Sequence, residues 1–199
     1  MSHAGDPNVL TPTMDRMSNE GASFRRAYAN CPVCTPSRGT IFSGRHAHCG
    51  PVPGFREAYK ATAPSTATVL KDQGYRTAYF GKWHCGIVHD QVPEAVRDQP
   101  GARHRTPEHL RAGFEDWFGF ELINDHFNTS IYEGDNLEPT SLPGYQTDVL
   151  TDRAIDYLRE YDRDTPLFMV LSVEPPHFPL EAPEKWRRFE PSSLQVRPN

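Results

Sequence analysis

The sequence lacks an apolar run near the roughly 20 residues that a membrane helix needs, and it lacks a surplus of positive charge. Its 199 residues include 21 Lys and Arg against 26 Asp and Glu, a formal net charge of −5. This balance argues against a surface for nucleic acid or for an anionic membrane. The first residues show no secretory signal, so a cytoplasmic location is expected by default. Any anion that the protein binds must therefore meet a local cluster of cations.

Cysteine is also scarce. The four cysteines are Cys31, Cys34, Cys49 and Cys85. Four are too few for a disulfide-dense scaffold, and we expect free thiols. The spacing Cys31-x2-Cys34 can begin a zinc site completed by His46, His48 or Cys49, but the usual second pair is missing. A redox disulfide at this spacing needs a thioredoxin-like context that the sequence does not provide.

The composition that is present indicates a folded chain. Hydrophobic residues make up 37% and charged residues 24%, both ordinary for a globular protein. The 19 prolines punctuate long irregular stretches such as 88–109 and 133–146. Together these features predict an α/β domain with long connections, which often carry function.

Periodicity and turn residues predict the main elements. Helices are expected over 11–21, 36–43, 66–73 and 146–161, and strands over 22–29, 75–80 and 167–173. Helices that are each followed by a strand favour a parallel sheet with helices on its faces. Ligands of such sheets bind beyond the carboxyl ends of the strands, which lie just after residues 80 and 173.

Chemically useful residues follow both predicted strands. Gly81-Lys82-Trp-His84 comes after the first strand, and Glu174-Pro-Pro-His177 comes after the second. Glycine permits a tight turn and the close approach of a ligand. The prolines restrict the backbone around His177. Both strand ends therefore direct cations or proton-transfer groups towards one edge of the sheet.

A third group begins at Cys34, in the sequence Cys-Thr-Pro-Ser-Arg. If a helix starts near this point, Cys34 lies where unpaired N–H groups and the helix dipole favour an anion. Arg38 is one turn further along the same side. Arg38, Lys82, His84 and His177 together can hold a tetrahedral dianion. Taken alone, each side chain has a more ordinary interpretation. Cys34 would most often be a buried thiol, and Arg38, Lys82, His84 and His177 would most often be solvated or otherwise satisfied side chains.

Three motifs together resemble those of the sulfatase family. Residues 34–45 resemble its first signature, with Cys-x-Pro-Ser-Arg and a Gly-Arg ending, and residues 74–84 resemble its second, Gly-Tyr-x-Thr-x-x-x-Gly-Lys-x-His. Residues 174–179 resemble its third active-site loop. Further similar segments are 8–16, 113–120 and 147–155. The resemblance covers nearly the whole chain, in the expected order.

The resemblance implies an alkaline-phosphatase-like α/β fold, of which residues 1–199 are the N-terminal portion of the catalytic domain. It implies a sulfuric ester hydrolase in which a formylglycine-generating enzyme oxidises Cys34. The hydrated aldehyde of formylglycine attacks the sulfur of a sulfate ester and later expels sulfate. The expected substrate is a small-molecule or saccharide sulfate ester, with no nucleic-acid or membrane partner. Relatives of this family are often exported.

The resemblance also assigns a role to each matching residue. Cys34 is the formylglycine precursor and a metal ligand, and Arg38 steadies the diol. Lys82 binds sulfate, and His84 contacts the diol. His177 binds sulfate and helps to protonate the leaving oxygen.

A divalent cation, most often calcium, is a further implication. A hard cation takes six or more oxygen ligands, and in the family these come from an Asp-Asp pair before position 8 and from residues beyond 199. Asp116, Asp125 and Asp135 do not match the metal motif. We therefore expect residues 1–199 alone to have little or no activity. The alternatives are a phosphonate or phosphate monoester hydrolase of the same superfamily, or an inactive truncated fragment.

Overall fold

The computed structural model describes residues 1–55, 57–61, 64–86, 104–162, 164–187 and 190–195. The chain forms two compact units. The larger one, Asn30–Glu181, contains the sheet and every predicted site residue. The smaller one combines Met1–Ala29 with Ala182–Asn199.

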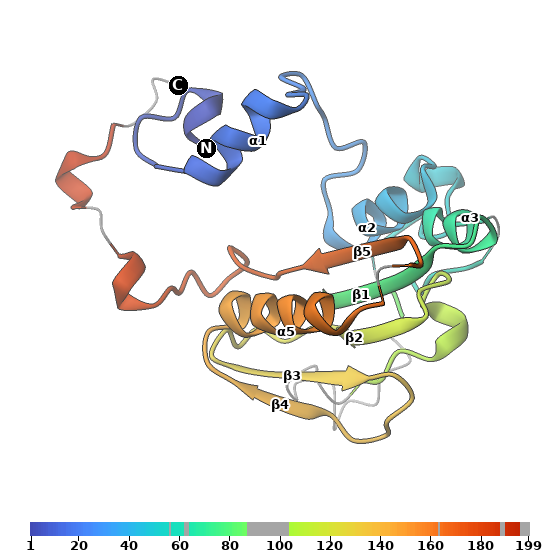
Figure 1. The fold of residues 1–199 in the computed structure, drawn as a ribbon. Coiled ribbons are helices and arrows are strands. Elements are labelled where there is room, and N and C mark those ends of the chain that lie inside the picture. Colours follow the sequence, from blue (N-terminus) through green and yellow to red (C-terminus); the bar gives the residue numbers. More distant parts are fainter. Residues whose placement is uncertain (56, 62–63, 87–103, 163, 188–189, 196–199) are drawn as a thin grey trace. The chain divides into compact units, whose positions relative to one another are not determined.

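The larger unit is built on a five-stranded mixed sheet with the order β4-β3-β2-β1-β5 (Figure 1). The strands are β1 (Arg76–Lys82), β2 (Asp116–Phe120), β3 (Asn128–Glu133), β4 (Thr140–Pro143) and β5 (Leu167–Ser172). β1 pairs in parallel with β2 and β5. The parallel arrangement of β1 and β5 agrees with the prediction from the sequence. β3 is antiparallel to both β2 and β4, an arrangement that the sequence analysis did not foresee.

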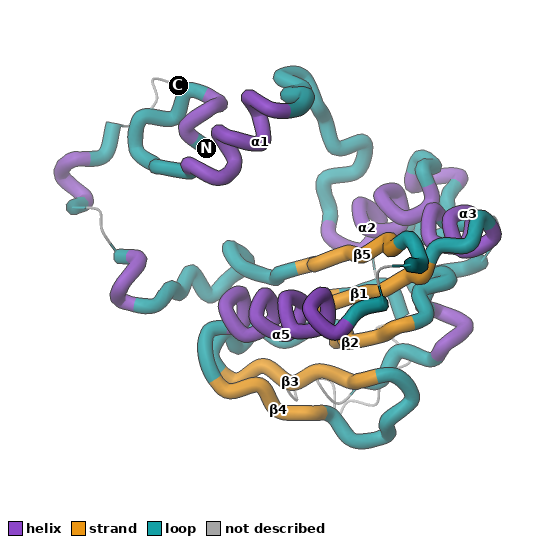
Figure 2. The backbone as a smooth tube through the Cα atoms, viewed as in Figure 1, coloured by secondary structure: helices purple, strands orange, loops and turns teal. Residues whose placement is uncertain are grey.

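Helices cover both faces of the sheet (Figure 2). They are α2 (Cys34–Ser43), α3 (Thr66–Asp72) and α5 (Gln146–Glu160). Alternate residues of β1 point to opposite faces: Phe80 packs with Ala154 of α5, whereas Tyr79 packs with Phe42 of α2. The expected α/β fold with flanking helices is therefore confirmed.

Aromatic rings fill the core between β1, β2 and the α2 side. Phe42 stacks on Trp83 with ring centroids 4.6 Å apart, and Tyr79 stacks on Trp117 at 5.1 Å. Such pairs add roughly 1 kcal/mol each beyond the burial of their area. Phe114 belongs to the same cluster, so the aromatic segment after residue 113 packs the core.

The four predicted helices are present with bounds within two residues of those expected, the largest difference being the start of α2 at Cys34 instead of residue 36. Ser65 caps α3: its hydroxyl accepts from the Thr68 amide at 3.0 Å, and the Thr68 hydroxyl accepts from the Ser65 amide at 2.7 Å. This capping box satisfies two amides that a helix start leaves unpaired. α2 ends at Gly44, in the left-handed conformation with φ 65°. None of the described helices combines the length and apolar character needed to cross a membrane.

The smaller unit is held mainly by polar contacts. The Asp15 carboxylate, in α1 (Pro12–Glu20), accepts from the Ser2 hydroxyl at 2.7 Å and from the His3 amide at 2.8 Å. The Asn8 side chain forms two hydrogen bonds with the backbone of Gln195, at 3.0 and 2.8 Å. These last bonds join the two ends of the chain.

The strand predicted over 22–29 is wrong. The segment contains a turn at 25–26 and has no strand assignment. Phe24 and Tyr28 are 83% and 86% exposed, so their apolar side chains have no sheet face to cover. Strand propensity alone does not form a strand where no neighbouring strand pairs with the backbone.

Gly81 is a sensitive point of the sheet. Its φ is 99°, and an added Cβ would lie 2.1 Å from the Ser172 carbonyl oxygen. We expect G81A to lower the free energy of unfolding by about 3 kcal/mol or more, from backbone strain and the clash. Gly74 is the matched control because its φ is 85° but a Cβ there meets open space. G74A should cost about 1 kcal/mol, because a residue with a Cβ is strained in the left-handed region. If urea denaturation shows equal losses of unfolding free energy in G81A and G74A, the expected clash with the Ser172 carbonyl is refuted.

Candidate active site

The backbone carbonyl of Lys82 joins three elements at the carboxyl edge of the sheet. It accepts from Arg38 Nη1 at 2.6 Å, from the Ser172 hydroxyl at 3.0 Å, and from the Tyr79 hydroxyl. Arg38 Nη1 also donates to Ser172 Oγ at 2.8 Å. The guanidinium on α2 is thus fixed against the ends of β1 and β5, as expected from strand ends that meet at one edge.

The side chain of Lys82 forms a buried ion pair. Its Nζ lies 2.5 Å from Glu174 Oε1, and the two side chains are 2% and 0% exposed. Gln146 supports Glu174 twice: its Oε1 accepts from the Glu174 amide at 3.1 Å, and its Nε2 donates to Glu174 Oε2 at 3.4 Å. The pairing compensates the large cost of burying two charges. Lys82 was expected at the site from its motif, whereas its pairing with Glu174 and the support from Gln146 appear only in the structure.

The loop after β5 presents His177. Its ring Nδ1 lies 2.8 Å from the Phe178 carbonyl oxygen, which can only accept, so Nδ1 carries a proton and Nε2 remains for a ligand. His126, fully buried, donates from Nε2 to the His177 carbonyl at 2.8 Å. The His177 amide binds the Glu174 carbonyl at 3.1 Å. The exposed imidazole therefore belongs to a loop whose backbone is held by hydrogen bonds to His126 and Glu174.

His84 lies in a turn directly after β1. Its φ of 54° is uncommon for a residue with a side chain, and it is 6% exposed. Phe55 meets the ring edge-on, with centroids 6.2 Å apart. The Trp83 amide still donates to the Phe120 carbonyl of β2 at 2.7 Å, so His84 follows the last backbone bond between the two strands.

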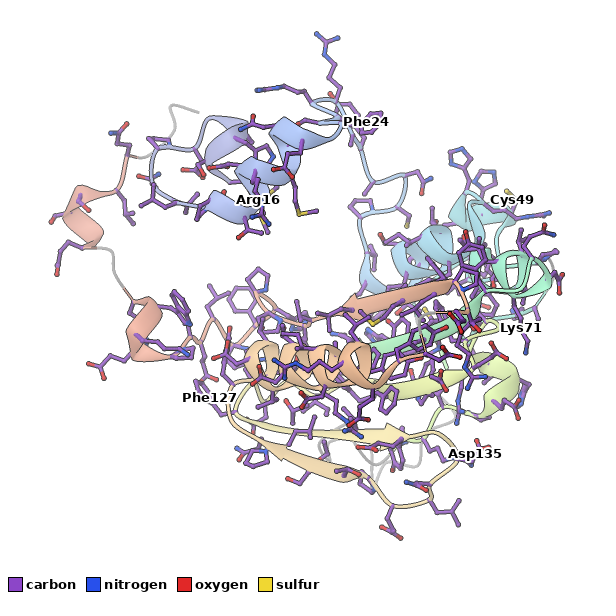
Figure 3. The ribbon with its side chains drawn as sticks, in the orientation of Figure 1. Arg16, Phe24, Cys49, Lys71, Phe127 and Asp135 are labelled. Carbon is purple, nitrogen blue, oxygen red and sulfur yellow. The ribbon has the colours of Figure 1, made fainter. Side chains whose placement is uncertain are left out.

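Cys34 is the first residue of α2, as the sequence predicts for a side chain at a helix N-terminus. It is partly exposed, and all four cysteines are free thiols. Cys85 is buried, and its thiol contacts the Thr35 carbonyl oxygen at 3.5 Å. Burial raises the pKa of Cys85 well above its usual range, so this thiol stays protonated. Cys49, in the short helix Ala47–Cys49, is exposed at the surface (Figure 3).

A buried carboxyl group, Glu121, lies close to the turn that carries His84. Burial raises its pKa to about 7, although hydrogen bonds from Thr106 and Gly86 and the charge of Arg38 act in the opposite direction. The Gly86 amide donates to Glu121 Oε2 at 3.0 Å, and the Thr106 hydroxyl donates to Oε1. No motif pointed to Glu121.

The described residues do not fit a divalent cation by themselves. Within the ranges that the structure describes, no group of three or more His, Cys, Asp or Glu side chains is placed to hold a metal. Asp116 instead binds Arg76, Asp125 binds Asn128, and Asp135 binds Arg105. The sequence did not match these three carboxylates to the metal motif. In the structure each of them binds a neighbouring side chain.

The structure thus places the five predicted residues in one unit, at or after the elements that carry their motifs. Arg38 and Lys82 are in direct contact, and Glu174 connects Lys82 to the loop of His177. The residues that sequence reasoning missed are Ser172, Gln146, His126 and Glu121. Each contacts a residue in or next to a motif that lies 28 or more positions away in the sequence.

The fold is that of the alkaline-phosphatase-like α/β proteins. One solved structure similar to this chain is of a protein in complex with D-glucosamine-2-N,6-O-disulfate, the substrate of that protein. It aligns with a TM-score of 0.70 and 28% identity, over 89% of this chain and 32% of that one. The phosphonate monoester hydrolase of Agrobacterium radiobacter aligns with a TM-score of 0.69 and 21% identity, over 98% and 42%. At that identity the second similarity concerns the fold alone.

The sulfatase family model matches residues 1–195, and the chain belongs to the sulfatase family. The Ulvan-active sulfatase of Formosa agariphila is 32% identical over 206 aligned positions, which cover 100% of this chain and 37% of that protein. The chain therefore spans well under half the length of this relative.

The buried Lys82–Glu174 pair should be strongly coupled. We expect K82M and E174Q each to lower the free energy of unfolding by about 3 kcal/mol or more. K82M leaves the buried Glu174 carboxylate unpaired, and E174Q leaves the buried Lys82 ammonium without its counter-charge. The double variant should lose about 2 kcal/mol less than the sum. The exposed pair Lys60–Glu57, at 2.6 Å, is the control and should show a coupling below about 1 kcal/mol. If the losses of unfolding free energy in K82M and E174Q simply add in the double variant, the predicted coupling between the two side chains is refuted.

The raised pKa of Glu121 predicts a pH dependence of stability. Between its ordinary value of 4.5 and about 7 the native carboxyl binds more protons than the unfolded one. The free energy of unfolding therefore falls as pH rises through this window, by about 3 kcal/mol at most. E121Q should lose this component, whereas E108Q, at an exposed carboxyl, should keep it. Denaturation curves from pH 4 to 8 that run parallel for E121Q and the unchanged chain would refute the assignment.

Proposed function

We propose that this protein is a sulfuric ester hydrolase whose nucleophile is a formylglycine derived from Cys34. The observation that carries the proposal is the contact of Arg38, one turn after Cys34, with the ends of β1 and β5. This contact brings the first signature to the strand ends that carry Lys82, His84 and His177. The three motifs therefore belong to one site.

The side chains divide the work by charge and position. Arg38 supplies a permanent positive charge next to the first turn of α2, whose amides also favour an anion. His177 presents Nε2 on a fixed loop, and it binds sulfate and protonates the leaving oxygen. His84 contacts the nucleophile at position 34 from the turn after β1.

Lys82 is proposed as a sulfate ligand, and its pairing with Glu174 sets a condition on that role. The ammonium has three donors, and one of them already faces Glu174 Oε1 at 2.5 Å. To bind sulfate, Lys82 has to keep Glu174 as a second partner or exchange one anion for the other. Glu174 then weakens the attraction for sulfate in the empty site and prevents an unpaired buried charge.

Formylglycine supplies a hydrated aldehyde as nucleophile, and a divalent cation, expected to be calcium, would polarise it when bound. Cys34 is the position proposed both for the modification, made by a formylglycine-generating enzyme, and for one metal contact. The described residues alone do not supply a cation site, so none of the roles above depends on the ion.

A saccharide sulfate ester is the proposed substrate class. The support comes from a relative named Ulvan-active sulfatase and from the solved complex with D-glucosamine-2-N,6-O-disulfate. A phosphonate monoester is the competing substrate, because a hydrolase of that class shares the fold. Rates on a saccharide sulfate, an aryl sulfate and an aryl phosphonate, measured side by side, separate the two classes.

The test of Cys34 combines chemistry with activity. Because residues 1–199 alone are expected to have little or no activity, the protein is produced with any sequence that its gene encodes beyond them. It is produced together with a formylglycine-generating enzyme and assayed with calcium on these esters. Mass spectrometry should find residue 34 converted to a lighter, hydrazide-reactive aldehyde. C34A should abolish sulfate release, while C49A, at an exposed cysteine outside the site, should leave it unchanged.

Each outcome has a clear meaning. An unconverted thiol at position 34, or sulfate release that persists in C34A, would refute the formylglycine proposal. A phosphonate rate well above both sulfate rates would replace the proposed reaction by the competing one. Conversion without turnover of any ester would favour the alternative interpretation, an inactive truncated sulfatase fragment.

A further inference from the structure

Glu121 is a buried acid that the proposed reaction does not use. It directly follows β2, and it has 0% exposure. β2 runs parallel to β1 with Phe120 opposite Lys82. The carboxyl group of Glu121 therefore lies beside the segment that leaves β1 and carries His84.

Its hydrogen bonds are directed at the backbone of that segment. Oε2 accepts from the Gly86 amide at 3.0 Å, and the Cys85 amide also binds the carboxylate. Oε1 accepts from the Thr106 hydroxyl. A Cβ added at Gly86 would lie 2.1 Å from Glu121 Oε1, so the backbone approaches the carboxylate as closely as glycine allows.

The same segment is anchored on its other side. The Cys85 carbonyl accepts from the Tyr59 amide at 2.5 Å. The Cys85 thiol lies against the Thr35 carbonyl, in the first turn of α2. The turn between His84 and Gly86 is thus held between β2 and the helix that begins at Cys34. His84, in its uncommon left-handed conformation, has little freedom once the two following amides are fixed.

We propose that Glu121 is a positioning residue, whose carboxylate holds the two amides after His84 and so fixes the imidazole at the site. The consequence for ester cleavage rests on the proposed function of His84. The hold itself is a property of the fold and can be measured without turnover.

Protonation should weaken this hold. The groups that face the carboxyl are the Thr106 hydroxyl, Arg38 on α2, and Tyr79 and Cys85 from β1 and the turn after it. Of these only Arg38 is charged near neutrality, because burial raises the pKa of both Tyr79 and Cys85. A protonated carboxyl turns one acceptor oxygen into a donor, so the bonds to the amides strengthen as pH rises through about 7.

Nuclear magnetic resonance of the 15N-labelled chain tests the proposal directly. The Gly86 amide proton should shift with pH, with a midpoint near 7. E121Q keeps the acceptor oxygen and the size, so it should abolish this shift while leaving the His84 ring signals near their usual positions. E121L removes the acceptor and should displace both the Gly86 and His84 signals. E108Q, an exposed acid, should behave as the unchanged chain.

The opposite results are equally clear. A pH shift at Gly86 that persists in E121Q, or unchanged Gly86 and His84 signals in E121L, would overturn the proposal. If E121L does not fold, T106V decides: it removes a hydrogen bond that lowers the pKa of Glu121 and should move the midpoint upward. An unmoved midpoint in T106V would also count against it.

Activity adds a readout that separates the two proposals. With a converted, active chain, E121L should lower kcat up to about a hundredfold with little change in KM, because a small displacement of a reacting group has an effect of this size. E121Q should change the pH profile of kcat near neutrality. If Cys34 is not converted in the unchanged chain, the proposed function fails, and the resonance measurements still decide the role of Glu121. Unchanged kcat and pH profile in both variants would refute the role in positioning His84.

Discussion

The backbone carbonyl of Lys82 is the point on which the rest of the site depends. Arg38, Tyr79 and Ser172 all donate to it, so one oxygen connects α2 with the ends of β1 and β5. A carbonyl has two lone pairs, and a third donor makes this a crowded, polarised centre. The arrangement fixes a cation next to the helix that begins at Cys34, before any ligand is present.

The same edge of the sheet is organised by pairs of buried groups. Glu174 compensates Lys82 and is itself held by Gln146, and His126 supports the loop of His177. Glu121 holds the turn of His84 from β2. The groups expected to act on the sulfate ester are thus each held in place by a buried neighbouring side chain. Such support limits their movement, which matters because catalysis depends on orientation at the scale of a fraction of an ångström.

Much of the architecture could be predicted because it depends on local signals. The α3 cap at Ser65, the end of α2 at Gly44 and the apolar run of β5 are each encoded within a few residues. The strands β2 to β4 escaped prediction because each is short and contains glycine, proline or several polar residues, which weaken the strand pattern. The segment 22–29 has strand-like residues but no partner strand, and propensity cannot supply one.

The sequence by itself determined the family motifs, their order and the residues Cys34, Arg38, Lys82, His84 and His177, because motif chemistry is read from residue types at fixed spacing. Only the tertiary structure decided which groups compensate and position them. Glu174 lies 92 positions from Lys82, and Glu121 lies 35 from Gly86. Their contacts, and the raised pKa of Glu121, come from burial and from the parallel alignment of strand ends, which no local pattern records.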